Sequence, residues 1–188
     1  MLNLEINNIK SICGALKLIG DVLSIKKFTK KFKVNDSDVI VIPGNGSFDH
    51  GIEMVRKKNF DILLKEHFGK NKIIGICLGM QIMCTSSEEG KEKGLGLINL
   101  HVKKISEKKI KLPLLGWYDV KFKDNYFKTK SFYFNNNYCY ETKASITLGF
   151  LEKIPSMIKF KNFYGFQFHP EKSGANGINL LKTVSDEK

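Results

Sequence analysis

Short apolar runs alternate with amphipathic segments along the first half of the chain. Apolar and polar residues alternate over residues 2–6, which predicts a short strand. Residues 9–19 carry apolar side chains at helical spacing, which predicts a helix. The β-branched run at 39–42 leads into Pro43-Gly44-Asn45-Gly46, as a buried strand leads into a turn.

The same alternation continues toward the middle of the chain. A helix is expected over residues 51–67 and a second buried strand over residues 73–76. Cys77 follows this strand, and residues 81–86 are expected to belong to the next helix. Strands that alternate with helices in this way are typical of an α/β protein with a largely parallel sheet.

The pattern changes between residue 94 and about residue 151, where short segments have strand composition. These segments lie at residues 121–122, 131–134 and 145–148. A further strand is expected at 165–168 and a closing helix at 178–184. We therefore predict a three-layer α/β fold whose central, mostly parallel sheet has an antiparallel portion. The chain shows no repeat or linker, so residues 1–188 are expected to form a single domain.

The formal charge of +12 raises the possibility of a nucleic-acid-binding surface. Lysines gather at 26–33, at 57–58 and between 103 and 111. However, Arg56 is the only arginine, and arginine is preferred for base readout and phosphate forks. No nucleic-acid-binding motif accompanies the lysines, so solvated lysine faces are favoured over a nucleic-acid partner.

The remaining composition points to a cytoplasmic protein. No apolar run reaches the length of about 18 residues that a membrane-spanning helix needs. The N-terminus lacks a basic region followed by an apolar stretch, so no signal peptide is expected. The cysteines form no CxxC pair, which favours reduced thiols over disulfides or a metal site. They are Cys13, Cys77, Cys84 and Cys139.

Cys77 stands in the most informative segment of the chain, Gly75-Ile76-Cys77-Leu78-Gly79. Glycines two residues before and two after the cysteine permit a sharp strand-to-helix turn, the geometry of a nucleophile elbow. A thiol at a helix N-terminus is favoured as the thiolate, which is the nucleophilic form. A buried structural cysteine after a core strand is the alternative that this segment alone leaves open.

Phe168-His169-Pro170-Glu171 supplies the groups that a nucleophilic thiol needs. A histidine can act as general base, and a carboxylate can fix the tautomer of its ring. Side chains two residues apart on extended chain point the same way, so Glu171 is expected to reach His169. A surface histidine in a turn is the alternative. The predicted strands ending at Pro43, at Cys77 and before His169 would place all three at one sheet edge.

At this point the residues resemble a known family, the class I glutamine amidotransferases. The segments GICLGMQ at 75–81 and GFQFHPEKSG at 165–174 resemble their catalytic motifs, and PGNGSFDHGI at 43–52 resembles their oxyanion loop. Segments 86–98, 111–120 and 168–181 resemble, more narrowly, the glutaminase subunit of imidazole glycerol phosphate synthase. The resemblance spans nearly the whole chain in the family's order and spacing.

The resemblance implies glutamine hydrolysis by a triad of Cys77, His169 and Glu171, with no cofactor and no metal. It also implies oxyanion and substrate-binding roles for a further set of residues. That set is Gly44, Asn45, Gly46, Leu78, Gln81, Glu89, Asn136, Asn137 and Tyr138.

The resemblance further implies a heterodimer with a (β/α)8-barrel synthase subunit, also called the cyclase. Ammonia from L-glutamine would pass into that subunit and join a phosphoribulosyl intermediate of histidine biosynthesis. The products would be imidazole glycerol phosphate and an aminoimidazole carboxamide ribotide. No nucleic acid and no membrane enter this chemistry.

Four segments depart from the family pattern. The family's glycine-containing first loop is replaced at 5–8, its loop valine by Asn45, its substrate strand by 134–138, and a His-Met pair by Leu114-Leu115. The resemblance implies a glutaminase that idles until the synthase is loaded, because an oxyanion-loop peptide must turn over. Asparagine enters positive-φ conformations more easily than valine, so Asn45 is expected to raise basal activity.

Other functions stay open at the level of sequence. A paralogous glutaminase could feed a different synthase, for example one that forms an amidine on a surface sugar. A catalytically inactive regulatory module and a basic nucleic-acid-binding module are the non-enzymatic alternatives.

Overall fold

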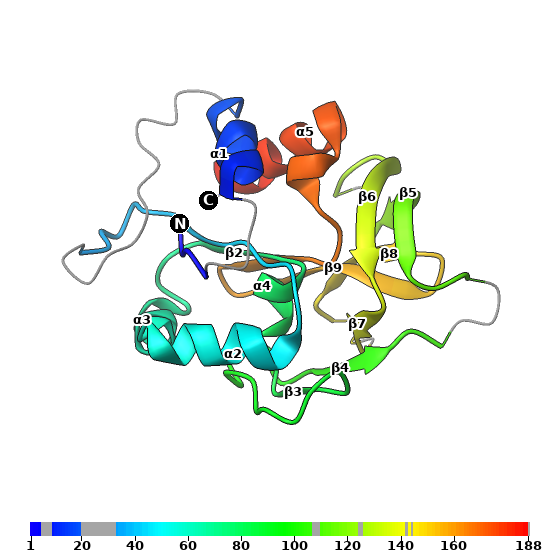
Figure 1. Ribbon diagram of the computed structural model, residues 1–188. Coiled ribbons are helices and arrows are strands. Elements are labelled where there is room, and N and C mark those ends of the chain that lie inside the picture. The colour runs from blue at the N-terminus through cyan, green and yellow to red at the C-terminus, as the bar shows by residue number, and fades with distance from the viewer. Residues whose placement is uncertain are drawn as a thin grey trace.

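The computed structural model describes residues 1–4, 9–19, 33–106, 110–123, 126–141, 143 and 145–187. Helices and strands alternate up to residue 81, and strands dominate from there to residue 166 (Figure 1). The helices are α1 (Ile9–Lys17), α2 (Phe48–Lys57), α3 (Phe60–His67), α4 (Leu78–Gln81), the 3-10 turn η2 (Pro170–Lys172) and α5 (Gly174–Asp186). The strands are β1 (Ile40–Ile42), β2 (Ile73–Ile76), β3 (Ser86–Ser87), β4 (His101–Lys104), β5 (Leu114–Phe122), β6 (Lys130–Asn136), β7 (Tyr138–Tyr140), β8 (Thr147–Leu151), β9 (Ile154–Phe160) and β10 (Phe163–Phe166).

The main sheet is mixed and has seven strands in the order β1-β2-β10-β9-β8-β5-β6. Strands β1, β2 and β10 pair in parallel, and every pairing from β10 through β9, β8 and β5 to β6 is antiparallel. The α/β class and the antiparallel portion are therefore as predicted, although the antiparallel part is the larger one. A small second sheet has the order β3-β4-β7.

Helices cover both faces of the parallel strands, so the domain has three layers (Figure 1). In β1, Ile40 and Ile42 pack into one core cluster with α2 and α3, while Val41 packs into the other with α1 and α5. This follows from the alternation of side chains along a strand. Continuous apolar runs in β1 and β2 are needed because both faces of these strands are buried.

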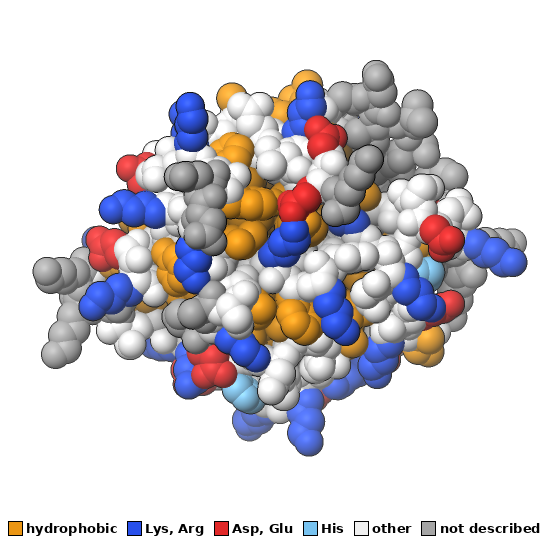
Figure 2. Space-filling model, turned by 180° about the vertical axis from the view of Figure 1, so that it is seen from behind, with side chains coloured by type: hydrophobic (Ala, Val, Ile, Leu, Met, Phe, Trp, Pro, Cys, Tyr) orange, Lys and Arg blue, Asp and Glu red, His pale blue; other side chains and the backbone are white. Residues whose placement is uncertain are grey.

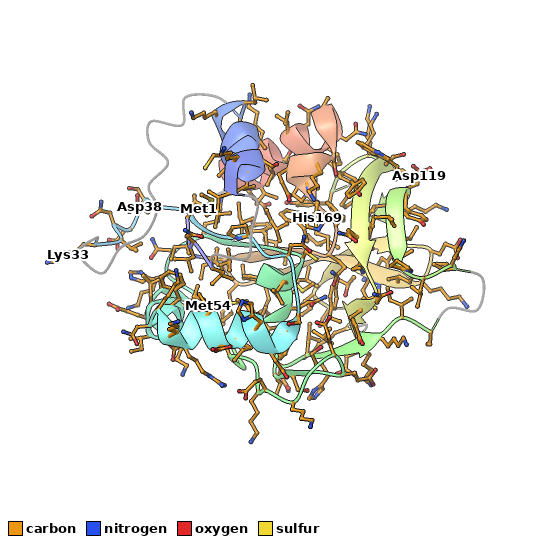
Figure 3. The ribbon with its side chains drawn as sticks, in the orientation of Figure 1. Met1, Lys33, Asp38, Met54, Asp119 and His169 are labelled. Carbon is orange, nitrogen blue, oxygen red and sulfur yellow. The ribbon has the colours of Figure 1, made fainter. Side chains whose placement is uncertain are left out.

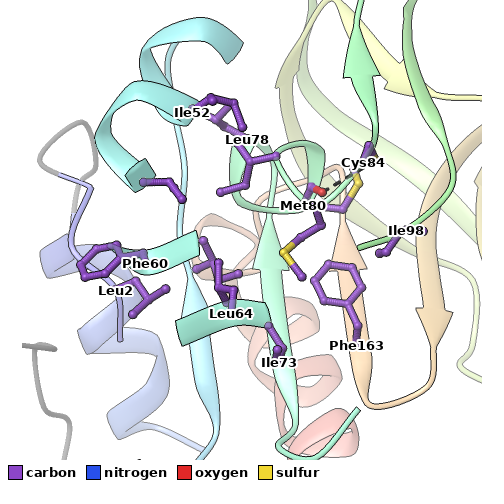
Figure 4. Packing of buried hydrophobic residues seen from close by; sticks show 14 of the residues in the cluster. Leu2, Ile52, Phe60, Leu64, Ile73, Leu78, Met80, Cys84, Ile98 and Phe163 are labelled. Carbon is purple, nitrogen blue, oxygen red and sulfur yellow. Dashed lines mark hydrogen bonds between the residues drawn. The ribbon is translucent and has the colours of Figure 1, made fainter. Parts of the chain in front are cut away.

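The core on the α2 and α3 side includes the helix that follows the turn at Cys77. Leu78 and Met80 of α4 lie in it together with Ile52, Leu64 and Phe163 (Figure 4). All five side chains are almost fully buried. The short helix after Cys77 is therefore fixed by packing rather than by its length, since four residues are too few for a stable isolated helix.

Two predicted helices have different bounds. The helix expected over 51–67 is two helices, because Asn59 adopts a left-handed conformation (φ 57°) between α2 and α3. The helix expected over 81–86 is wrong, since α4 ends at Gln81 and Ser86–Ser87 form β3. The carbonyls of residues 82–84 accept hydrogen bonds from the amides of 95, 96 and 98, so they are not available to continue a helix.

The remaining predicted elements are close to those observed. The predicted helix at 9–19 corresponds to α1 and the one at 178–184 lies within α5. Residues 1–4 form no strand, although the Leu2 amide donates to the Val41 carbonyl at 2.9 Å. Residues 5–8, most of the lysine group at 26–33 and residues 107–109 lie outside the described part of the chain.

Charge is dispersed over the surface that Figure 2 shows. Lysine and arginine side chains stand there among acidic and apolar side chains. Within the described ranges, no helix is long and apolar enough to cross a bilayer.

Candidate active site

Cys77 occupies a sharp turn between β2 and α4. Its backbone has φ 51° and ψ −113°, a conformation that non-glycine residues rarely adopt. The Cys77 amide donates to the Phe166 carbonyl at 2.7 Å, which ties the turn to the end of β10. Strained backbone held in this way is characteristic of functional sites, and a positive φ is what the predicted nucleophile elbow requires.

Glycines let the 43–46 loop lie directly against this turn. A Cβ atom on Gly79 would stand 1.8 Å from the Ile42 carbonyl oxygen, and one on Gly44 would stand 2.4 Å from the Gly79 nitrogen. The loop therefore borders Leu78, the first residue of α4. Gly46 has the positive φ of this loop (119°), while Asn45 is exposed and has no positive φ.

His169 and Glu171 form the second half of the site, and Figure 3 labels His169 at the centre of the molecule. His169 Nδ1 lies 2.8 Å from Glu171 Oε1, and His169 is only 2% exposed. The His169 amide donates to the Tyr133 carbonyl at 2.8 Å, and Ser173 Oγ donates to the His169 carbonyl at 2.6 Å. The ring is thus held from its backbone and from Nδ1. Glu171 reaches the ring as predicted, but from the 3-10 turn η2. The extended chain that the sequence pattern predicted here is wrong.

The Cys77 sulfur and the Glu171 carboxylate both influence the pKa of His169. Burial lowers the pKa of His169, but the Cys77 sulfur and the Glu171 carboxylate together raise it, to about 10. Because Glu171 occupies Nδ1, the nitrogen that remains for the thiol is Nε2. Nε2 is buried and forms no hydrogen bond of standard geometry within the described residues.

Two buried amides connect the sulfur to the β7 strand. Gln167 Nε2 donates to Cys77 Sγ at 3.7 Å, and Gln81 Nε2 donates to Gln167 Oε1 at 3.1 Å. Gln81 Nε2 also lies 3.4 Å from the Tyr138 carbonyl oxygen. The sequence pattern had indicated Gln81 and Tyr138 but not Gln167. The missed signal is its spacing, two residues before His169.

The other expected binding residues are placed unequally. Asn136 is buried and its Nδ2 donates to the Tyr138 carbonyl at 2.9 Å, so it joins the network. Asn137 is exposed. Glu89 Oε2 accepts from the Phe48 amide at 2.9 Å, which places this carboxylate at the start of α2, just after the glycine loop. Partial desolvation raises the pKa of Glu89, against the Phe48 hydrogen bond, which lowers it.

The other histidines have partners of their own. His50 pairs with Glu53, His67 with Asn71 and His101 with Ser86. Among the residues that the structure describes, no three histidine, cysteine or acidic side chains are grouped so as to hold a metal ion.

Comparison with known proteins agrees with this geometry. The family model "Glutamine amidotransferase class-I" matches residues 2–184. A protein of Listeria innocua named imidazole glycerol phosphate synthase subunit HisH is 35% identical, over 97% of this chain and 92% of that protein. A protein of Methanococcus maripaludis, named subunit HisH 2 of the same synthase, is 37% identical, over 87% of this chain and 93% of that protein.

A solved structure described as a glutamine amidotransferase has the same fold. It superposes with a TM-score of 0.78 at 14% identity and covers 99% of this chain and 98% of its own. The family model covers nearly the whole chain and decides the assignment. The chain belongs to the class I glutamine amidotransferase family.

Proposed function

We propose that this protein is the glutaminase subunit of an imidazole glycerol phosphate synthase, with Cys77, His169 and Glu171 as its catalytic triad. The observation that supports the proposal is that buried His169 pairs with Glu171 through Nδ1 while the Cys77 sulfur raises its pKa. The names of relatives that match nearly the whole chain support the choice of synthase. Reduced thiols such as Cys77 persist in the cytoplasm, which we propose as its compartment.

The triad divides the reaction into two steps. Cys77 Sγ attacks the side-chain amide carbon of glutamine as the thiolate, since its proton is already on His169 Nε2, and His169 gives that proton to the departing ammonia. Water then cleaves the γ-glutamyl thioester, which releases glutamate and restores the thiol. Glu171 keeps Nδ1 protonated, so that Nε2 is the nitrogen that exchanges the proton.

The turn itself supplies charge stabilisation. Each tetrahedral intermediate carries a negative oxygen, and backbone N–H groups beside the sulfur are placed to receive it. We assign one such donor to Leu78 and the other to the loop Gly44-Asn45-Gly46, which packs against α4. The substrate glutamine is proposed to be held by a further set of residues: Gln81, Glu89, Asn136, Asn137 and Tyr138.

The partner would be a (β/α)8-barrel synthase subunit that receives the ammonia. Leu115 and Trp117 on β5 are large apolar side chains, 57% and 54% exposed. Trp117 packs edge-on against Tyr133, whose carbonyl holds His169. An apolar face this close to the triad suits a subunit that must seal the ammonia path from water.

Co-purification followed by assay tests the proposal. The chain should form a complex with the barrel subunit, and the complex should use glutamine as its nitrogen source. Cys77→Ala should abolish glutamine-dependent turnover and leave synthesis from free ammonia intact. Glutamine-dependent turnover by Cys77→Ala would refute the triad.

Association with a different synthase, such as one that forms an amidine on a sugar, would refute the assignment to histidine biosynthesis. The departures at 135–137 and 114–115 from the family pattern are what make that second synthase worth testing.

A further inference from the structure

Gln167 has a buried amide side chain that plays no part in the proposed triad. It follows β10 directly, is 0% exposed, and its backbone amide donates to the Ser156 carbonyl at 2.9 Å. A buried amide side chain without partners is costly, so both of its ends are expected to be engaged. The donor end meets the Cys77 sulfur and the acceptor end meets Gln81.

The contact with Gln81 fixes the orientation of the Gln167 amide. Gln81 Nε2 is a donor, so the Gln167 atom 3.1 Å from it must be the acceptor Oε1. The NH2 group is thereby turned toward Sγ. Gln81 is itself 4% exposed and anchored toward the Tyr138 carbonyl, which also accepts from Asn136 Nδ2.

We propose that Gln167 is a positioning residue for the nucleophile: its amide, oriented by Gln81, donates a hydrogen bond to Cys77 Sγ and stabilises the thiolate. Gln167 and His169 stand two residues apart and approach the same sulfur. Their tasks differ, because the imidazole exchanges a proton while the amide only donates a hydrogen bond. The inference rests on the proposed role of Cys77 as nucleophile.

Gln167 and Gln81 form a relay of two amides, which also connects the Cys77 sulfur to β7, the strand proposed to bind substrate. Tyr138 begins β7, and its carbonyl is the anchor of Gln81. A shift of β7 would reach the sulfur through two amides.

Alkylation of Cys77 by iodoacetamide as a function of pH tests the inference without substrate. A Cys13→Ser background leaves Cys77 as the reactive thiol, because burial raises the pKa values of Cys84 and Cys139 to about 12. Gln167→Met keeps the side-chain length but removes the donor. The midpoint of its profile should move up by about one pH unit, with a roughly tenfold slower reaction at neutral pH. Catalytic turnover should fall more than substrate affinity.

Two further variants separate positioning from folding. Asn71→Leu removes another buried amide, which donates to the carbonyls of Asn35 and Asp38. Asn71 precedes β2, whereas Cys77 follows it, so this variant should leave the alkylation profile unchanged. Gln81→Met should shift the profile in the same direction but less. The double variant Gln81→Met with Gln167→Met should match Gln167→Met alone, because Gln81 then has nothing to orient.

A wild-type profile in Gln167→Met, or shifts that add in the double variant, would overturn the relay. Either result would leave the proposed function intact, since that depends on glutamine hydrolysis by Cys77. Loss of the proposed function would instead appear as glutamine hydrolysis that survives Cys77→Ala.

Discussion

His169 Nδ1 lies 2.8 Å from Glu171 Oε1 although the two residues have different backbone conformations. His169 is extended (φ −104°, ψ 90°), and Glu171 lies in a 3-10 turn that Pro170 begins. The turn folds the carboxylate back onto the ring. Proline at the first position of a helical turn costs no hydrogen bond and fixes φ, so the sequence His-Pro-Glu favours this geometry.

Glu171→Gln should therefore change stability in a pH-dependent way. Burial lowers the pKa of His169 in the folded protein, but the Cys77 sulfur and Glu171 raise it to about 10, whereas an unfolded histidine has a pKa of about 6.5. The stabilisation of the imidazolium is complete below the lower value and is lost as the pH rises through the higher one. The variant should have a lower free energy of unfolding by about 1–2 kcal/mol at mildly acidic pH, with a smaller deficit at alkaline pH. Denaturant titrations at both pH values measure it, and a deficit that grows with pH would contradict the argument.

Gly79→Ala should disrupt the elbow. The new Cβ would meet the Ile42 carbonyl oxygen at 1.8 Å, so the loop and α4 must move apart. We expect a loss of about 2–3 kcal/mol in the free energy of unfolding and the loss of glutamine hydrolysis. Gly14→Ala in α1 is the matched control: nothing lies within 4 Å of its Cβ, so this variant should be more stable by about 0.5–1 kcal/mol. Equal effects of the two variants would argue against close packing at the elbow.

Asn45→Val should lower glutamine hydrolysis in the absence of a partner. Position 45 precedes Gly46, which has the positive φ in the loop. A β-branched side chain resists the positive φ that a turned-over loop peptide would require. Asn45→Gly is the control and should hydrolyse glutamine at least as fast as the wild type. Basal hydrolysis by Asn45→Val that equals or exceeds the wild-type rate would exclude this role.

Trp117→Ala should weaken association with the barrel subunit. The side chain is 54% exposed on β5, and truncation of an aromatic anchor costs about 2 kcal/mol, or roughly thirtyfold in Kd. Ile62→Ala is the control. It removes a side chain that is 61% exposed on α3, which lies at the opposite side of the molecule from β5 (Figure 1), and should leave Kd unchanged. Calorimetric titration compares the two. The same loss in both variants would remove β5 from the interface.

Several elements of this protein could be predicted from the sequence because local patterns encode them. The apolar runs of β1 and β2 are continuous because both faces of these strands are buried, and Gly75 and Gly79 stand where the turn at Cys77 needs them. The strand composition of residues 131–134 likewise predicted β6. Residue types at these positions are dictated by neighbours close in sequence or by burial itself.

Contacts between distant segments decided the rest. Nothing local at 82–86 opposes a helix. The amides of 95, 96 and 98 prevent one because they donate to the carbonyls of 82–84. Gln167 looked like one more residue of a strand, and only the fold brings it to Cys77 and to Gln81, 90 and 86 residues away in sequence. The sequence by itself determined which side chains could do the chemistry, since their types and spacing are local. Tertiary structure alone decided which atoms each of them meets, because a hydrogen bond depends on positions that the whole fold sets.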